Sequence, residues 1–267
     1  MKWWRHVCAM ELRKILAYRS DFWITFLGQT LIQVVIARAL WSSIFSANDA
    51  TVMNGFTLEM MALYYLIVPL GNKILAGENV GFVAREIYDG TFSRYLIYPL
   101  SAFQYKTMTF LTHSSFYMIQ LLLIVSGYVL LFQTELFTLN FLLQLVSGAG
   151  IFLLAALAYM LLALSLELIA LWADNIWSLV VMLRFFTAFL GGGSVPLTFF
   201  PEWAQKVVYF TPFPYLISLP VRTIMGSIQT EEILKGILIL IGWIFIMMEV
   251  VKFIWKKGQL RFTGVGQ

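Results

Sequence analysis

The sequence of 267 residues has few charged residues and few of the residues that build metal sites. Lys, Arg, Asp and Glu make up 12% of it, and it has two histidines and one cysteine. By contrast 60% of the residues are hydrophobic, and the mean hydropathy is +0.82. Soluble domains have about a quarter of their residues charged, so the sequence is not that of an ordinary soluble protein. The single cysteine, Cys8, excludes an internal disulfide framework.

Several functional motifs are also missing. The sequence contains no G-x-x-x-x-G-K-[ST] loop for binding nucleotide phosphates. His6 and His113 are far apart, and with Cys8 they do not form a cluster with metal-ligand spacing. We therefore expect no metal site, no cofactor and no catalytic residue on this chain. The start of the sequence lacks the apolar core and cleavage site of a signal peptide, and the pI near 9.1 is not taken as a sign of nucleic-acid binding.

The sequence does contain long hydrophobic runs, and crossing a bilayer takes about 20 apolar residues. They predict an all-α polytopic membrane protein with one transmembrane domain over 22–267. Its six spans are 22–45, 56–76, 107–132, 141–171, 176–190 and 233–255. Residues 1–21 place Trp4, Cys8, Leu12 and Ile15 on one helical face, which predicts an amphipathic helix at the membrane interface. The alternative for 1–21 is an ordinary basic tail.

Basic residues indicate the orientation of these spans. Twelve would lie on one side: Lys2, Arg5, Arg13, Lys14, Arg19, Arg85, Arg94, Lys106, Lys252, Lys256, Lys257 and Arg261. The loops on the other side hold three: Lys206, Arg222 and Lys235. Because cytoplasmic loops carry an excess of Lys and Arg, both termini and the loop between spans two and three are expected in the cytoplasm. We expect the chain in a plasma (bacterial inner) membrane.

The loop between spans two and three, 81–106, is the longest polar interruption of the sequence. Asp89-Gly90 within it is a turn signal, and Pro99 ends any preceding helix. We expect a short helix, a turn and a second amphipathic piece at the membrane surface. The alternative is a solvated loop whose charges only set the topology. Those charges are on Arg85, Glu86, Asp89, Arg94 and Lys106.

Five ionisable residues fall within the predicted spans, where charge is costly and often functional. Arg38 and Glu59 both lie near the outer ends of their spans, where they can pair. Lys73 and Glu167 lie toward the cytoplasmic side and can pair in the same way. Arg184 either faces a cavity or dimer interface and meets an anionic group, or makes a structural salt bridge or hydrogen bonds to backbone carbonyls.

The stretch 194–225 contains five of the seven prolines, too many for one continuous helix. It is nevertheless apolar, and Trp203, Tyr209 and Tyr215 suit a membrane interface. We expect a re-entrant outer segment of short helices that enter the outer leaflet, with its irregular backbone buried in protein. The alternative is an aromatic loop lying on the bilayer.

This arrangement resembles the type-2 ABC exporter permeases over nearly the whole chain. The stretch REIYDGTFSRYLIYPLS at 85–101 is similar to the family's coupling region, where an acidic residue, a Gly and a later Pro-Leu-Ser recur. FPEW at 200–203, PFPY at 212–215 and Arg222 are similar to the outer segment after span five. Thr211-Pro212-Phe213 stands where the family often has Asn-Pro-Leu, a departure that leaves the subfamily open.

The resemblance implies the permease subunit of an ATP-driven exporter. It would form a dimer with an identical or sister-gene permease in the lipid bilayer and bind two cytoplasmic ATPase subunits, which hold the ATP and Mg. The residues expected to couple to the ATPase are Arg85, Glu86, Asp89, Gly90 and Arg94. Those expected along the pathway or dimer interface of spans one, two and five are Arg38, Glu59 and Arg184. Those expected to mark the outer segment are Pro201, Trp203, Pro212, Pro214 and Tyr215.

The apolar and aromatic lining of that interface predicts a substrate that is amphiphilic, lipid-linked or drug-like. Two other functions stay open on the residues alone. One is an ion- or proton-coupled secondary transporter without an ATPase. The other is an intramembrane enzyme centred on His113 and Ser114, because a nucleophile needs a neighbouring base.

Overall fold

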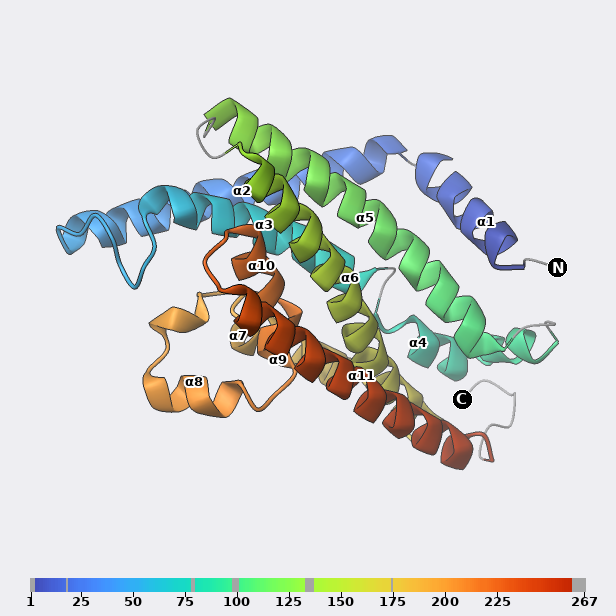
Figure 1. Cartoon of the computed structure of the whole chain (residues 1–267). Coiled ribbons are helices and arrows are strands. Elements are labelled where there is room, and N and C mark those ends of the chain that lie inside the picture. The colour runs from blue at the N-terminus through green and yellow to red at the C-terminus, as the bar shows by residue number, and fades with distance from the viewer. Residues whose placement is uncertain are drawn as a thin grey trace.

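The structure, a computed structural model, describes residues 3–17, 19–77, 80–97, 101–132, 137–173 and 175–260. In this part of the chain every regular element is a helix. Figure 1 shows the long helices as one elongated bundle, with smaller helices at its sides. The all-α prediction is therefore confirmed for the described residues.

Five helices are long and apolar enough to cross a membrane, judged by length and composition. They are α2 (Arg19–Ala47), α3 (Leu58–Ala76), α5 (Ala102–Phe132), α6 (Leu139–Glu167) with its 3-10 extension η3 (Leu168–Leu171), and α11 (Thr230–Gly258). The remaining predicted span, span five at 176–190, corresponds to α7 (Trp177–Leu190), which has 14 residues. At 1.5 Å per residue α7 is about 21 Å long, shorter than the roughly 30 Å of hydrocarbon. Six spans thus stay a prediction.

The ends of the long helices follow local signals in the sequence. The Thr57 hydroxyl accepts a hydrogen bond from the Met60 nitrogen at 3.2 Å and caps the start of α3. Thr138 caps α6 in the same way, through the Phe141 nitrogen at 3.3 Å. Gly77, with φ +53°, ends α3 in a conformation that other residues adopt rarely.

Helix α6 is the centre of the bundle. It packs against α3, α5, α11 and the short helix α10 (Ser218–Ile224), and Figure 1 shows it running between α5 and α11. Its contacts depend on small residues, as is common between membrane helices. A Cβ on Gly148 would lie 2.9 Å from the Pro220 carbonyl oxygen of α10, and one on Gly71 of α3 would overlap the Phe152 ring of α6.

The N-terminal helix α1 (Trp3–Ala17) packs against α5. Its buried residues are Val7, Glu11 and Ile15. The face expected to be apolar is therefore only partly the buried one, because Trp4 and Leu12 are exposed. Glu11 is buried instead, and its carboxylate has two polar partners there. It lies 2.8 Å from Lys14 Nζ and 3.3 Å from His113 Nε2 of α5.

The proline-rich stretch folds as four short helices. They are η4 (Leu197–Phe199), α8 (Glu202–Val208), α9 (Phe213–Leu216) and α10. Tyr64 and Tyr65 of α3 donate hydrogen bonds to the carbonyls of Gly192 and Ser194, which fixes the turn before this stretch. The expected short helices are present, whereas their entry into the outer leaflet stays a prediction.

Candidate coupling site

The polar loop between α3 and α5 contains two short helical pieces. The first, α4 (Phe82–Tyr88), follows Gly81, and the second, η1 (Thr91–Leu96), follows Gly90. Both glycines have positive φ, +106° and +72°, which favours glycine at these two positions. The Asp89-Gly90 signal thus correctly predicted the turn. Helix α5 begins at Ala102, so the end of the predicted segment already belongs to a long helix, and Pro99 lies outside the described residues.

One face of this loop is buried against the ends of other helices. Val83, Ala84 and Ile87 of α4 form a hydrophobic cluster with η3 and with the start of α7. Phe92 of η1 extends the cluster, since its ring centroid lies 5.7 Å from that of Trp255 on α11. The α4–η1 unit, residues 81–96, is therefore packed onto the bundle rather than solvated on all sides.

The start of α4 is held by a carboxylate from the end of α6. Glu167 Oε1 accepts a hydrogen bond from the Gly81 nitrogen at 2.9 Å, and Oε2 accepts one from the Val83 nitrogen at 2.8 Å. The first N–H groups of a helix have no partner within it and favour a negative charge. Within the described residues no ion pair joins Glu167 to Lys73, so the pair suggested by the sequence is wrong: the carboxylate binds backbone groups instead.

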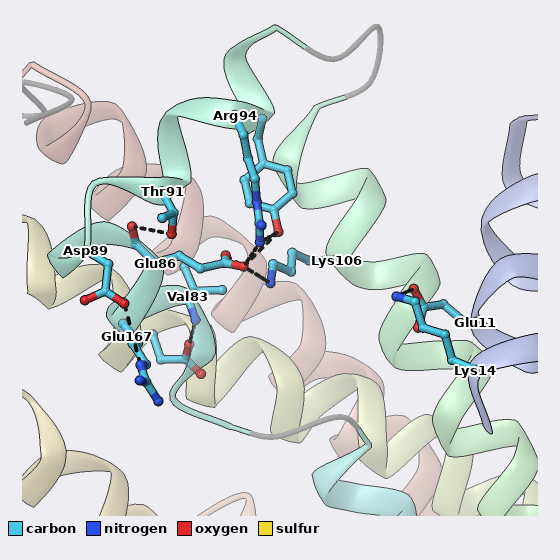
Figure 2. Close-up of polar contacts among 11 residues, drawn as sticks. Glu11, Lys14, Val83, Glu86, Asp89, Thr91, Arg94, Lys106 and Glu167 are labelled. Carbon is cyan, nitrogen blue, oxygen red and sulfur yellow. Dashed lines mark hydrogen bonds and ion pairs between the residues drawn. The ribbon is translucent and has the colours of Figure 1, made fainter. Parts of the chain in front are cut away.

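The Glu86 side chain of α4 connects α4 to η1 and to α5 (Figure 2). Its carboxylate pairs with Arg94 of η1 and accepts a hydrogen bond from the Tyr95 hydroxyl at 2.9 Å. Lys106 Nζ of α5 lies 3.0 Å from Glu86 Oε2. The Arg94 guanidinium carbon also lies 5.0 Å from the Tyr95 ring centroid, within cation–π range. Because the Glu86 side chain is only 13% exposed, it stabilises the loop and is poorly placed to contact another protein.

Two of the predicted coupling residues face outward. The Arg85 and Asp89 side chains are 76% and 46% exposed, and they form a loose pair at 3.6 Å, one helical turn apart. Tyr88 lies between them in sequence and is also exposed. The structure thus separates Glu86, which is enclosed by its partners, from Arg85 and Asp89, which face outward. Arg94 pairs with Glu86, but its side chain is 50% exposed.

The charged residues predicted for the pathway do not form one cluster. Arg38 and Glu59 are both exposed, and no ion pair joins them in the described part of the chain, so the pairing suggested by the sequence is wrong. Arg184 Nη2 donates to the Val80 carbonyl oxygen at 3.4 Å, just before α4. This is the backbone contact that the sequence offered as one of two roles for Arg184.

The predicted residues of the outer segment fall into two environments. Pro212, Pro214 and Tyr215 are buried, and the Tyr215 hydroxyl donates to the Tyr209 carbonyl at 3.1 Å. Pro201 and Trp203 are exposed, with Trp203 72% exposed. Helix α8, which contains Trp203, stands apart from the bundle in Figure 1.

The residues of the enzyme alternative point to different partners. Ser114 is buried, and its hydroxyl donates to the Ile74 carbonyl at 2.9 Å. His113 faces Glu11 of α1. Neither contact joins the hydroxyl to the imidazole, and both contacts hold helices together.

Two residues of the site were not assigned to it from the sequence. Glu167 was identified as a charged residue within a span, but the sequence contains no signal for its hydrogen bonds to backbone nitrogens at the start of α4. Tyr95 gave no signal of its own, since it is one of 12 tyrosines.

Comparison with known proteins identifies one family. The family described as "ABC-2 family transporter protein" matches residues 31–266. The match confirms the resemblance to type-2 ABC permeases, and it covers the second part of α2, the other long helices, α4 and the proline-rich stretch. No curated protein and no solved structure matches the chain.

Proposed function

We propose that this chain, which belongs to the ABC-2 family of transporter proteins, is the permease subunit of an ABC exporter. Two cytoplasmic ATPase subunits bind ATP and Mg and supply the energy. A second permease, identical or from a sister gene, completes the pathway. The protein spans the plasma (bacterial inner) membrane with both termini in the cytoplasm.

The proposal rests on one observation: the α4–η1 unit has one side attached to the helix bundle and one side exposed. Its inner side is joined to α6 by Glu167, to α5 by the Glu86–Lys106 pair and to α11 by the Phe92–Trp255 contact. Its outer side presents Arg85 and Asp89. A piece attached in this way moves as a unit with the helices that it contacts, and its outer charges complement those of a protein partner.

The exposed apolar faces support a second permease and an amphiphilic substrate. Of the helices that correspond to spans one, two and five, α2 and α7 leave large apolar side chains uncovered in the isolated chain, whereas α3 is mostly buried within it. We therefore assign the pathway and the interface mainly to α2 and α7. The uncovered residues are Leu31, Ile32, Val35, Ile36 and Leu40 on α2, and Trp177, Val181, Met182, Phe185 and Phe189 on α7.

The test is co-purification of the ATPase with the tagged full-length chain in mild detergent. The informative variant exchanges the exposed pair, Arg85→Glu with Asp89→Lys, which keeps the net charge and inverts the local pattern. We expect this variant to insert normally and to lose most of the ATPase. The matched control exchanges the other exposed pair, Glu249→Lys with Lys252→Glu, whose atoms lie 2.6 Å apart on α11.

Two results would contradict the proposal. One is that no ABC ATPase accompanies the unaltered chain. The other is that the Arg85/Asp89 exchange retains as much ATPase as the Glu249/Lys252 exchange.

A further inference from the structure

A cavity of about 340 Å³ lies between α3, α5, α6 and α7. Its polar lining includes Asn72 and Lys73 from α3, Tyr159 from α6, and Arg184 and Thr187 from α7. It lies at the end of the bundle that carries α4. Lys73 is one turn before the end of α3, and Arg184 reaches the Val80 carbonyl that precedes α4.

The two cations of this cavity face no acidic side chain among the described residues. Neither Lys73 nor Arg184 takes part in an ion pair there, and the nearby Glu167 carboxylate is used by the N–H groups of Gly81 and Val83. An arginine cannot lose its proton in a protein, and charge within membrane helices is costly unless it is paired. Counted over the described residues alone, the cavity therefore has an excess of positive charge.

A second observation points to a ligand with oxygen atoms. Thr187 is buried, and its hydroxyl is among the few buried polar atoms of the described chain that make no hydrogen bond. Buried polar groups nearly always have a partner. A guanidinium and an ammonium on one cavity, with an unpartnered buried hydroxyl in its wall, suit a phosphate, whose oxygens accept from donors of these kinds.

We propose that this cavity binds a phosphate-class anion, either the headgroup of an anionic lipid or amphiphile, or free phosphate. The headgroup is favoured by the surroundings of Arg184 on α7, where Val181 and Phe185 are exposed apolar side chains that an acyl chain can cover. The site requires no ATPase and holds whether or not the chain couples to one.

The experiment measures the thermal unfolding of the purified full-length chain in a neutral detergent, followed by tryptophan fluorescence. The probes are dioctanoyl phosphatidylglycerol, dioctanoyl phosphatidylcholine and inorganic phosphate. We expect phosphatidylglycerol to raise the melting temperature, phosphatidylcholine to have no effect, and the Lys73→Gln/Arg184→Gln variant to need at least tenfold more phosphatidylglycerol for the same shift. A response to inorganic phosphate that the variant also loses assigns the site to free phosphate.

The matched control is Lys256→Gln/Lys257→Gln, which removes two basic residues from the last turn of α11. We expect it to keep the lipid response, because its charges lie outside the cavity. Without added anion, the Lys73/Arg184 variant should melt at the same temperature as the unaltered chain or higher, since it removes two unpaired charges. This comparison also detects a variant that fails to fold, in which case the single Arg184→Gln variant replaces it.

Three results would overturn the proposal. The first is that no anion stabilises the unaltered chain. The second is that the Lys73/Arg184 variant keeps the response of the unaltered chain, whatever the control does. The third concerns Glu78, which lies outside the described residues. An anion response that appears only in Glu78→Gln would mean that this carboxylate already neutralises the cations.

Discussion

The Glu167 carboxylate at the end of α6 lies 2.9 Å from the backbone nitrogen of Gly81, where α4 begins. The contact joins two segments that are 86 residues apart. It couples the position of the α4–η1 unit to that of the central helix α6. We make four predictions from this and similar contacts.

The first prediction concerns Glu167→Ala. The substitution removes the acceptor of two N–H groups, at least one of them buried, and an unsatisfied buried group costs about 1–3 kcal/mol. We expect the first turn of α4 to open more often, so that amide hydrogen exchange over 81–88 becomes at least tenfold faster. Glu167→Gln keeps one oxygen acceptor and should have a smaller effect.

The control for Glu167 is Glu249→Ala, which removes an exposed carboxylate of α11 and should leave exchange over 81–88 unchanged. Exchange rates over 81–88 that are equal in Glu167→Ala and the unaltered chain would show that this carboxylate does not hold α4.

The second prediction is that substitution of Glu86 lowers the stability of the chain more than substitution of its neighbour Arg85. Glu86→Ala leaves Lys106, with 23% of its side chain exposed, without its carboxylate partner. Hydrogen bonds to charged groups contribute about 1.5–3 kcal/mol, so we expect a clear fall in melting temperature. Arg85→Ala removes an exposed side chain and should change stability by less than about 0.5 kcal/mol.

A double-mutant cycle tests whether Glu86 acts through Lys106. We expect Glu86→Gln and Lys106→Gln to be non-additive by about 0.5–3 kcal/mol, as for residues in contact. Additive effects, or a melting temperature as low in Arg85→Ala as in Glu86→Ala, would refute the separation of the enclosed Glu86 from the outward-facing Arg85.

These contacts also show which features of the structure can be predicted from the sequence and which cannot. Hydrophobic length predicted the five long helices, because a span must present apolar side chains over its whole length. Asp89-Gly90 predicted the turn after α4, because the signal is local. The sequence could not show that Glu167 binds backbone nitrogens, since backbone groups are the same at every position. For the same reason the suggested pairs Lys73–Glu167 and Arg38–Glu59 were chosen by charge and depth alone, and both were wrong.

The third prediction concerns the attachment of α1 to α5. Glu11 is buried between Lys14 and His113, so Glu11→Ala removes one polar link between the two helices and leaves the hydrogen bond from the Thr112 hydroxyl to the Cys8 sulfur. We expect faster hydrogen exchange over residues 3–17 and unchanged exchange over α6. Arg5→Ala on the exposed side of α1 is the control. If α1 exchanges no faster in Glu11→Ala than in Arg5→Ala, the Glu11–His113 contact does not hold α1 on α5.

The fourth prediction uses two glycines of α6 that differ only in their surroundings. A Cβ on Gly148 would lie 2.9 Å from the Pro220 carbonyl oxygen and would overlap a side-chain carbon of Ile224, whereas a Cβ on Gly150 would meet nothing within 4 Å. Gly148→Ala should therefore force α10 away from α6, at a cost of about 1–3 kcal/mol. Gly150→Ala should be neutral or stabilising by up to about 1 kcal/mol, because alanine favours a helix more than glycine. Thermal unfolding measures the melting temperature of both variants. We expect that of Gly148→Ala to fall below the value of the unaltered chain and that of Gly150→Ala to stay equal or rise. Equal melting temperatures would mean that α6 and α10 do not approach closely, and that the proline-rich segment is not seated on the central helix.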